Sequence, residues 1–455
     1  MDNHVFSLVV TGGTAVLPSG IIRADIAAED GKIAAIGAPG TLLGHKTVCA
    51  EGKYVLPAVV DAHVHFNDPG LPEREDMHTG TSAAAAGGVG TVIDMPLSGN
   101  PAVTSVETLE LKKSAAQQRA VTDYALWGGL VSDNTQQLEA MSRHGAAAFK
   151  AFTCFAGNDF PYATPDVLLR GMKEAARIGA LVGVHCEDEA LTAASEQRAR
   201  AEGRLSVRDF LDAHSPLTER LASDMVMDMA AETGARVHIC HATLPSVIDR
   251  AKDFANVTVE TCPHYLIFSE DDLERLGGVL KCTPPVRSKE IVEELWKRVF
   301  DGSIDMISSD HSPSATVQKN PSSGSFWDAW GGVQGVQTML CALYTEGVVR
   351  RGLPLERLVE LVCASPAKIF GLYPQKGALQ LGSDADFVIF DPNAEWTLTP
   401  EILLHKNKHS PYIGRTFCGR VESTFVRGSC VYENGTITAR AGSGQLITPA
   451  KRSSL

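Results

Sequence analysis

Short apolar segments alternate with helical stretches in the middle of the chain, from Tyr54 to about residue 310. Each apolar segment is hydrophobic throughout rather than at every second residue, which is typical of parallel strands covered on both faces. Eight such units over roughly 300 residues predict a (β/α)8 TIM barrel, which usually needs about 250 residues or more. The predicted strands are Val55–His65, Gly90–Met95, Asp123–Val131, Ala146–Thr153, Ala180–His185, Arg236–His241, Val257–Thr261 and Ser303–Ser309.

The two ends of the chain have a different pattern. Residues 1–55 and 375–455 contain short strands separated by turns and show no helix-length periodicity. Asp30-Gly31 between two apolar runs predicts a β-hairpin. We therefore expect residues 1–55 and 375–455 to form one small β-sandwich domain that ends in a C-terminal tail, beside a barrel of residues 56–374.

Charge and cysteine content narrow the possible partners and location. The net charge of −13 at pH 7 argues against nucleic acid or an anionic membrane as a partner. No apolar run approaches the length of a membrane span. The ten cysteines are scattered, and the N-terminus does not look like a signal peptide. We expect a cytoplasmic protein that acts on a small molecule.

Metal-binding side chains occur where the predicted strands end. Barrel enzymes place their catalytic residues at the C-terminal ends of the strands. The first strand ends in His63-Val64-His65, and residues two apart on a strand point to the same side. Imidazole and carboxylate groups are common ligands of zinc-like metals. The same edge should carry four imidazoles, one carboxylate and one lysine, which predicts a metal centre formed by His63, His65, Lys150, His185, His241 and Asp310.

Each assignment has an alternative. His238 competes with His241, which lies nearer the strand end and is followed by a turn. His185 is open to interpretation as a core histidine, and Asp310 as a turn residue. Lys150 either extends to the rim of the barrel or lies buried as a neutral amine, the form that reacts with carbon dioxide to give a carbamate.

Charge balance favours a carbamate. Four neutral imidazoles cannot hold two divalent cations tightly, whereas a carbamate on Lys150 and the carboxylate of Asp310 would supply the missing negative charge. Nitrogen and oxygen donors suit zinc, with cobalt, manganese and nickel as alternatives. Two such ions share a water of lowered pKa that attacks a carbonyl, and a carboxylate then acts as the general base. Asp310 is the candidate for this catalytic role.

The chain resembles the amidohydrolase superfamily, in particular its cyclic-amidase branch of dihydroorotases, hydantoinases and allantoinases. The resemblance extends from about Val5 to Gly435. It implies a binuclear metal centre, a carboxylated Lys150, hydrolysis of a cyclic amide and a homotetramer. The motifs that carry it are Asp61-Ala62-His63-Val64-His65, the Lys150 strand, Val184-His185, Ile239-Cys240-His241, Glu260-Thr261-Cys262-Pro263-His264-Tyr265-Leu266, Ser309-Asp310-His311-Ser312-Pro313, Ser365-Pro366-Ala367-Lys368-Ile369-Phe370-Gly371 and Gly382-Ser383-Asp384-Ala385-Asp386.

Within this branch the chain is most similar to allantoinases, which open allantoin to allantoate. Dihydroorotases have an arginine at the position of Asn67. The chain departs from the family pattern at Ser98-Gly99-Asn100-Pro101 and at Thr153-Cys154-Phe155. By resemblance, the expected substrate contacts are Asn67, Ser98, Cys262, His264, Lys281, Cys282, His311, Pro313 and Trp330.

Other functions remain open. Within the same chemistry, the alternatives are a hydantoinase or dihydropyrimidinase, a dihydroorotase, or another cyclic imide hydrolase. From a different class, the alternative is a non-catalytic scaffold protein that has lost its metal ligands. All six ligand positions are occupied here, which favours an enzyme.

Overall fold

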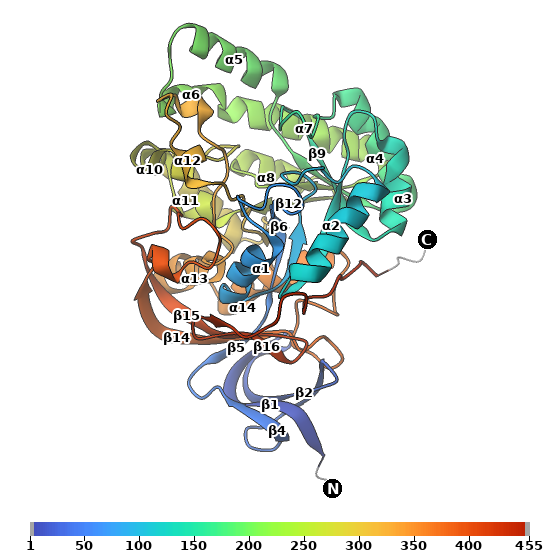
Figure 1. Cartoon of the computed structure of the whole chain (residues 1–455), viewed down its shortest axis with the longest axis vertical. Coiled ribbons are helices and arrows are strands. Elements are labelled where there is room, and N and C mark those ends of the chain that lie inside the picture. Colours follow the sequence, from blue (N-terminus) through green and yellow to red (C-terminus); the bar gives the residue numbers. More distant parts are fainter. Residues whose placement is uncertain (1–3, 451–455) are drawn as a thin grey trace.

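A barrel of eight parallel strands forms the centre of the computed structural model, which describes residues 4–450 (Figure 1). Each strand pairs with its neighbours in chain order, and a parallel bridge between Val64 and His311 brings the two edges together. The predicted (β/α)8 fold is therefore confirmed. The barrel strands are β6 (Val59–Val64), β7 (Val89–Asp94), β8 (Asp123–Gly129), β9 (Ala146–Phe152), β10 (Leu181–His185), β11 (Arg236–Ile239), β12 (Val257–Thr261) and β13 (Met306–Ile307).

Helices cover the outside of the barrel, and their ends have the expected sequence signals. Helix α4 has Pro165 in its first turn and ends at Gly179, whose φ of 70° is easily adopted only by glycine. Helix α7 repeats this arrangement with Pro216 and Gly234. The main covering helices are α1 (Met77–Ala86), α2 (Val106–Arg119), α3 (Leu138–Arg143), α4 (Pro165–Ile178), α7 (Pro216–Thr233), α8 (Pro245–Ala251), α11 (Lys289–Phe300), α13 (Met339–Leu343) and α14 (Leu355–Val359).

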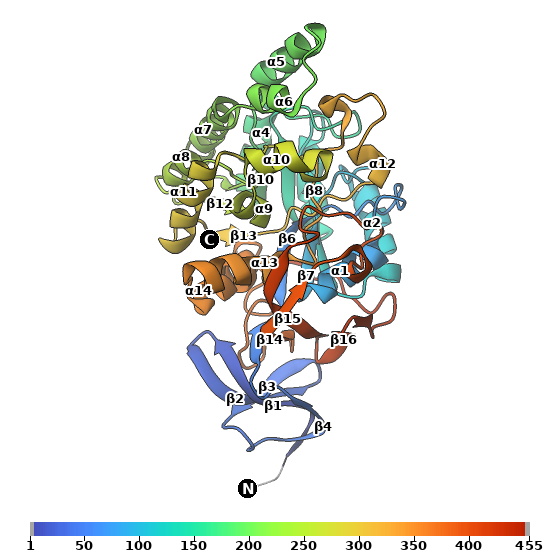
Figure 2. The same ribbon diagram turned by 90° about the vertical axis from the view of Figure 1, so that its left-hand side faces the viewer.

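Both ends of the chain join in a separate nine-stranded sheet below the barrel (Figure 2). Strand β1 pairs with β4 along its first half and with β5 near its end, so the sheet folds over its own core. Asp30 and Gly31 connect β2 to β3 with φ values of 50° and 76°, which confirms the predicted hairpin. The strands are β1 (Val5–Leu17), β2 (Gly20–Glu29), β3 (Lys32–Gly37), β4 (Leu43–Cys49), β5 (Tyr54–Pro57), β14 (Phe387–Thr397), β15 (Thr416–Val426), β16 (Ser429–Glu433) and β17 (Thr436–Ile437). The parts of the predicted terminal domain at residues 1–3 and 451–455 lie outside the described residues.

Two predicted strands need correction. The segment Val55–His65 was expected to be one strand, but it divides at Ala58 into β5 of the terminal sheet and β6 of the barrel. The backbone N–H of Ala58 donates to Asp386 rather than to a barrel strand, which ends the terminal sheet at this residue. The predicted strand Ser303–Ser309 is reduced to Met306–Ile307, although the N–H groups of Asp305 and Ser308 still donate to carbonyls of β12.

A helical cap rises above the barrel between β10 and α7 (Figure 1). We use this name for α5 (Glu189–Ala201) and α6 (Val207–Ala213) with their connections, residues 189–215. The cap contacts the loop that follows β13: the indole N–H of Trp327 donates to Arg204, and the N–H of Phe326 donates to Leu205. These two segments together cover one side of the barrel mouth.

The remaining short helices lie in the connections after β12 and β13. They are α9 (Pro263–Ile267), α10 (Glu270–Leu276), α12 (Thr316–Lys319) and α15 (Ser365–Ile369). Among residues 4–450, no helix combines the length and the hydrophobicity that crossing a bilayer requires.

Candidate metal centre

The six predicted metal ligands lie together at the C-terminal ends of the barrel strands. β6 and the residue after it supply His63 and His65, β9 supplies Lys150 and β10 supplies His185. The remaining ligands, His241 and Asp310, follow the last residues of β11 and β13. All six line one cavity of about 440 Å³, a size suited to a small molecule.

The predicted ligands form two groups within this cavity. In the first, Oδ1 of Asp310 lies 3.2 Å from Nε2 of His63 and 3.2 Å from Nε2 of His65. In the second, Nδ1 of His185 lies 3.1 Å from Nε2 of His241. The two groups adjoin, since the rings of His63 and His241 are 5.3 Å apart. Two neighbouring cations could therefore each have their own set of donors.

Several donor atoms in this cavity are buried without a hydrogen-bond partner among the described residues. They include Nε2 of His63, Nζ of Lys150 and Nδ1 of His241. Buried polar atoms are nearly always paired, so an unpaired group of nitrogens marks a site that a further atom completes. Nitrogen donors beside a carboxylate suit zinc-like cations. The donor set thus fits the binuclear divalent centre that the sequence predicts.

Lys150 lies near both groups, since its charge acts on His63 of the first and on His241 of the second. Its side chain is fully buried, and its Nζ lies 5.0 Å from the ring centroid of Phe152. A buried ammonium group without a partner is costly. Lys150, which is unpaired among the described residues, therefore indicates that a further group completes this site.

The protonation states of the ligands suit metal binding. Burial, reinforced by the charge of Lys150, lowers the pKa of His241 well below its usual value, so its ring is a neutral donor. Burial opposes ionisation of Asp310, but the neighbouring His63 and His65 outweigh it and lower the Asp310 pKa to about 2. Asp310 is therefore an anion at neutral pH.

Two of the ligands have an unusual backbone conformation. His241 has a φ of 39° and Asp310 a φ of 44°. Residues other than glycine seldom adopt this left-handed backbone conformation. Neighbouring bonds hold this strain: the N–H of His241 donates to Glu260 over 3.2 Å, and the N–H of His65 donates to the carbonyl of His311 over 2.7 Å. Strained residues of this kind are typical of functional sites.

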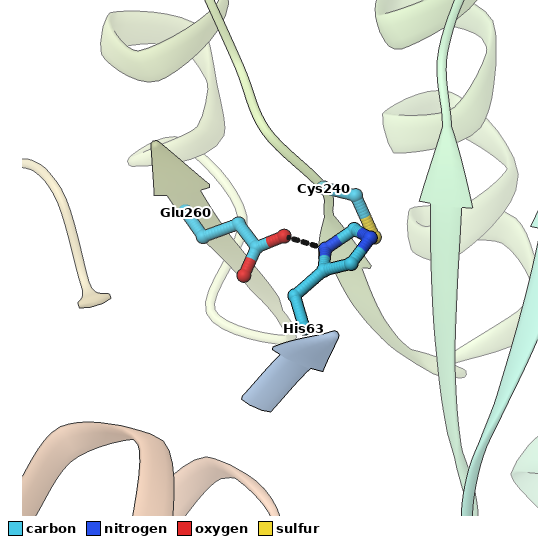
Figure 3. Close-up of side chains that lie close together, drawn as sticks. All are labelled: His63, Cys240 and Glu260. Carbon is cyan, nitrogen blue, oxygen red and sulfur yellow. Dashed lines mark hydrogen bonds and ion pairs between the residues drawn. The ribbon is translucent and has the colours of Figure 1, made fainter. Parts of the chain in front are cut away.

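Two buried glutamates contact the predicted ligands from outside. Oε1 of Glu260, at the end of β12, lies 2.5 Å from Nδ1 of His63 (Figure 3). Oε2 of Glu187, two residues after β10, lies 2.9 Å from Nε2 of His185. The sequence analysis gave neither residue a role. The available signal for Glu260 was an acidic residue near the end of β12, one of the three barrel strands that carry no predicted ligand.

The predicted substrate contacts divide into two sets. Ser98, Lys281, Cys282 and Trp330 line the cavity. The ammonium group of Lys281, however, donates to the carbonyls of Phe326, Trp327 and Ala329 over 2.8–2.9 Å, so it supports the loop after β13. The residues that the structure does not place in the cavity lining are Asn67, Cys262, His264, His311 and Pro313.

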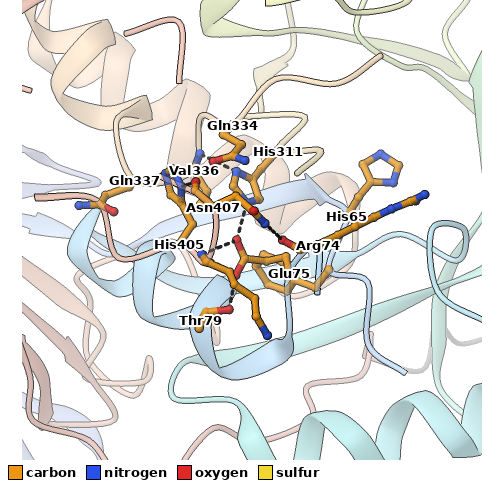
Figure 4. A network of polar contacts seen from close by, with 12 residues as sticks. His65, Arg74, Glu75, Thr79, His311, Gln334, Val336, Gln337, His405 and Asn407 are labelled. Atoms are coloured by element: carbon orange, nitrogen blue, oxygen red, sulfur yellow. Dashed lines mark hydrogen bonds and ion pairs between the residues drawn. The ribbon is translucent and has the colours of Figure 1, made fainter. Parts of the chain in front are cut away.

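His311 instead belongs to a buried polar network that includes Glu75 and His405 (Figure 4). Its Nδ1 accepts from the N–H of Gly335 over 3.2 Å, and its Nε2 lies 3.8 Å from Oε2 of Glu75. Burial lowers the pKa of His311 to about 3, which keeps its ring neutral. His311 therefore supports the backbone beside Asp310.

Comparisons with known proteins agree with this geometry. The sequence profile of the Amidohydrolase family matches residues 54–431. An allantoinase of Solibacter usitatus is 39% identical over 97% of this chain and 96% of its own length. An allantoinase of Rubrobacter xylanophilus is 40% identical over 98% of both chains. Among solved structures, the L-hydantoinase (dihydropyrimidinase) of Arthrobacter aurescens superposes with a TM-score of 0.95 at 34% identity, covering 98% of this chain and 100% of its own.

Proposed function

The chain belongs to the amidohydrolase family, and on this premise we propose that it hydrolyses the ring amide of allantoin to give allantoate. The observation that carries the chemistry is the cavity in which all six predicted ligands meet. The substrate is supported by the two allantoinases, which match nearly the whole chain at 39% and 40% identity.

Each of the six predicted ligands has a part in the proposed reaction. His63, His65 and Asp310 would hold one divalent cation, His185 and His241 a second, and a carbamate on Lys150 would bridge them. When bound, the cations supply Lewis acidity that activates water and polarises the scissile carbonyl. Asp310 accepts the proton of the attacking water and passes it to the ring nitrogen as the C–N bond breaks.

The finer chemical assignments belong to the same proposal. Zinc is the proposed metal because the donors are imidazole nitrogens and carboxylate oxygens, with cobalt, manganese or nickel as substitutes. The carbamate on Lys150 is supported by the complete burial of this side chain and its lack of a hydrogen-bond partner among the described residues. Mass spectrometry of the intact protein, prepared with and without bicarbonate, would test this modification.

A homotetramer in a reducing cytoplasm completes the proposal. Its support is the family membership, and the ten cysteines, which are all free of disulfide bonds. Light scattering on the purified protein measures the assembly directly.

A second candidate activity is hydrolysis of hydantoins or dihydropyrimidines. It is favoured by the close superposition on the L-hydantoinase of Arthrobacter aurescens, with a TM-score of 0.95. The same metal centre would serve this reaction, because the ring amide is shared. The two candidates therefore differ in the substrate and not in the proposed mechanism.

One panel of substrates separates the candidates. Ring opening by the metal-loaded protein is measured on allantoin, dihydroorotate, hydantoin, dihydrouracil and a plain cyclic imide, with metal content determined in parallel. A strong preference for allantoin supports the proposal. Activity confined to another ring would support metal-dependent hydrolysis of a cyclic amide but exclude allantoin as the substrate. Two bound metals without activity on any ring would reject both candidates.

A further inference from the structure

We infer that two buried glutamates, Glu260 and Glu187, are positioning residues that each select the ring tautomer of one metal-binding histidine. Glu260 acts on His63 in the group with His65 and Asp310, and Glu187 acts on His185 in the group with His241. The inference rests on the binuclear centre proposed above, but not on the identity of the substrate.

The argument begins with Glu260 and His63. Oε1 of Glu260 lies 2.5 Å from Nδ1 of His63, and both side chains are about 1% exposed (Figure 3). Both oxygens of this carboxylate also accept other hydrogen bonds, Oε1 from the N–H of His241 and Oε2 from the hydroxyl of Ser308. An ionised carboxylate only accepts hydrogen bonds, so Nδ1 of His63 must carry the ring proton. The lone pair is then on Nε2, the atom that faces Asp310 and has no other partner.

Glu187 selects the opposite tautomer. Its Oε2 lies 2.9 Å from Nε2 of His185, which places the ring proton on Nε2 and the lone pair on Nδ1. Nδ1 is the atom that lies 3.1 Å from Nε2 of His241. His63 would thus bind metal through Nε2 and His185 through Nδ1. The two rings would bind through different nitrogens, so one carboxylate cannot orient both. Each ring needs its own carboxylate at the nitrogen that does not bind metal.

Further bonds hold each carboxylate in place. Glu260 also accepts from the hydroxyl of Ser308 over 2.5 Å and from the N–H of His241 over 3.2 Å. Its position is therefore linked to both strained backbone segments that carry ligands. The hydroxyl of Thr153 accepts from the N–H of Glu187 over 3.0 Å and lies 3.0 Å from the carbonyl of His185. This bond gives Thr153, where the chain departs from the family pattern, a structural role.

Glu187 also connects the metal centre to the helical cap. Its second oxygen, Oε1, lies 2.7 Å from Nδ1 of His214, a cap residue that lines the cavity. Glu187 therefore needs two acceptor oxygens for two imidazole donors. Glutamine has one acceptor oxygen, so Glu187→Gln must lose one of these bonds although its size is unchanged.

Metal affinity provides the test, independent of turnover. Apoprotein of the wild type, Glu260→Gln and Glu187→Gln is titrated with Zn²⁺ in competition with a chromophoric chelator. Loss of a carboxylate that orients a metal-binding histidine typically weakens affinity by about 10- to 100-fold, and we expect this loss for one of the two ions in each variant. Glu219→Gln is the matched control, since Glu219 is buried and paired with Arg287 but contacts none of the six ligands.

Double-variant cycles identify the histidine that each glutamate serves. The effect of Glu187→Gln should disappear in a His185→Asn background and persist in a His63→Asn background, and Glu260→Gln should show the reverse. Glu187→Asp and Glu260→Asp keep the charge but shorten its reach, so they should reproduce the loss if a glutamine variant does not fold. Wild-type affinity in all four variants, or an equal loss in Glu219→Gln, would overturn the inference. An inactive wild type that still binds two ions would reject the proposed function only.

Discussion

Two clusters of buried charged side chains lie at opposite ends of the barrel. The upper cluster is the candidate metal centre. The lower one lies where β8 begins and contains Asp123, Asp384 and Asp386, whose oxygens are within 4.8 Å of one another. By residue type and spacing, both clusters are candidate metal sites.

Charge compensation separates the two clusters. Nζ of Lys376 lies 2.8 Å from Asp384 and 2.7 Å from Asp386 and also pairs with Asp123, which is bonded to Arg427 as well. The lower cluster is therefore satisfied by the chain itself, whereas the upper one leaves several nitrogens without partners among the described residues. The lower cluster joins the terminal sheet to the barrel. Those unpaired nitrogens of the upper cluster are free to bind cations.

The largest effect is expected from Lys150→Ala. Removing the proposed bridge takes an anionic ligand from both cations, so metal affinity should fall by more than about 100-fold, beyond the usual effect of an outer contact. Ring opening should become undetectable. Metal analysis of the purified variant, with turnover on the preferred substrate, measures both effects.

Lys112→Met is the matched control for Lys150→Ala. Lys112 is equally buried, but its Nζ is paired with Asp94 at 2.8 Å. This variant should lose stability and keep its metals. Wild-type metal content and turnover in Lys150→Ala would exclude the bridging role.

Asp310→Asn is the next largest change. The amide keeps an oxygen that can face the first cation, but it cannot accept the proton from water. General acid–base groups contribute about 10²- to 10⁴-fold to turnover, and we expect a loss of about 10³-fold with much of the metal retained. Steady-state kinetics on metal-analysed protein measures it, and turnover within a few fold of the wild type would remove Asp310 as the base.

Sequence patterns predicted the barrel because its signal is local and repeated. Uniformly apolar strands, helix-forming stretches and their end signals recur along the chain. The His63–Val64–His65 spacing likewise predicted from strand geometry that both imidazoles point to one place, and Nε2 of each lies 3.2 Å from Oδ1 of Asp310. The division at Ala58 was missed because β5 and β6 are both apolar. Strand β5 pairs with β14 near the C-terminal end of the chain, whereas β6 pairs with the next barrel strand, β7.

Contacts between distant residues account for the other gaps. Glu260 and His63 are 197 positions apart, and Lys376 and Asp123 are 253 apart, so neither pair has a local signal. Lys281 illustrates the same limit: no sequence pattern indicated that its ammonium group donates to the loop carbonyl of Phe326, and its predicted substrate contact stays a prediction. The sequence predicts which polar side chains lie at the ends of the barrel strands. Contacts with distant residues determine which of these side chains have no hydrogen-bond partner within the protein.

Lys376→Met should have a smaller effect, confined to stability. The variant leaves three buried aspartates without their shared cation, and breaking a buried pair in this way costs about 3–5 kcal/mol. The metal centre is at the other end of the strands, so metal content and turnover should be unchanged at temperatures where the variant is folded. Urea unfolding measures the loss.

Lys32→Met provides a milder comparison. Lys32 contacts Asp384 from a position that is 47% exposed, so its removal should cost less than removal of Lys376. Loss of bound metal in Lys376→Met would show that the two clusters are coupled.

Glu75→Gln should have the smallest effect on metal binding and turnover, because Glu75 is not one of the predicted ligands, and the effect on stability should depend on pH. Burial raises its pKa from 4.5 to about 7, although His405 and bonds from Thr79 and Lys406 oppose the rise (Figure 4). Between pH 4.5 and 7 the folded protein holds this proton more tightly than the unfolded chain does. Stability therefore falls as pH rises, with a slope of at most about 1.4 kcal/mol per pH unit.

The glutamine variant should remove this slope. Its stability relative to the wild type should increase from pH 4.5 to 7 and then level off, as measured by urea unfolding at a series of pH values. Glu73→Gln, two residues away and exposed, serves as the control and should follow the wild type. Parallel curves for Glu75→Gln and the wild type would show that Glu75 is ionised throughout. It would then be a compensated carboxylate like those of the lower cluster, with neighbouring hydrogen bonds in the place of Lys376.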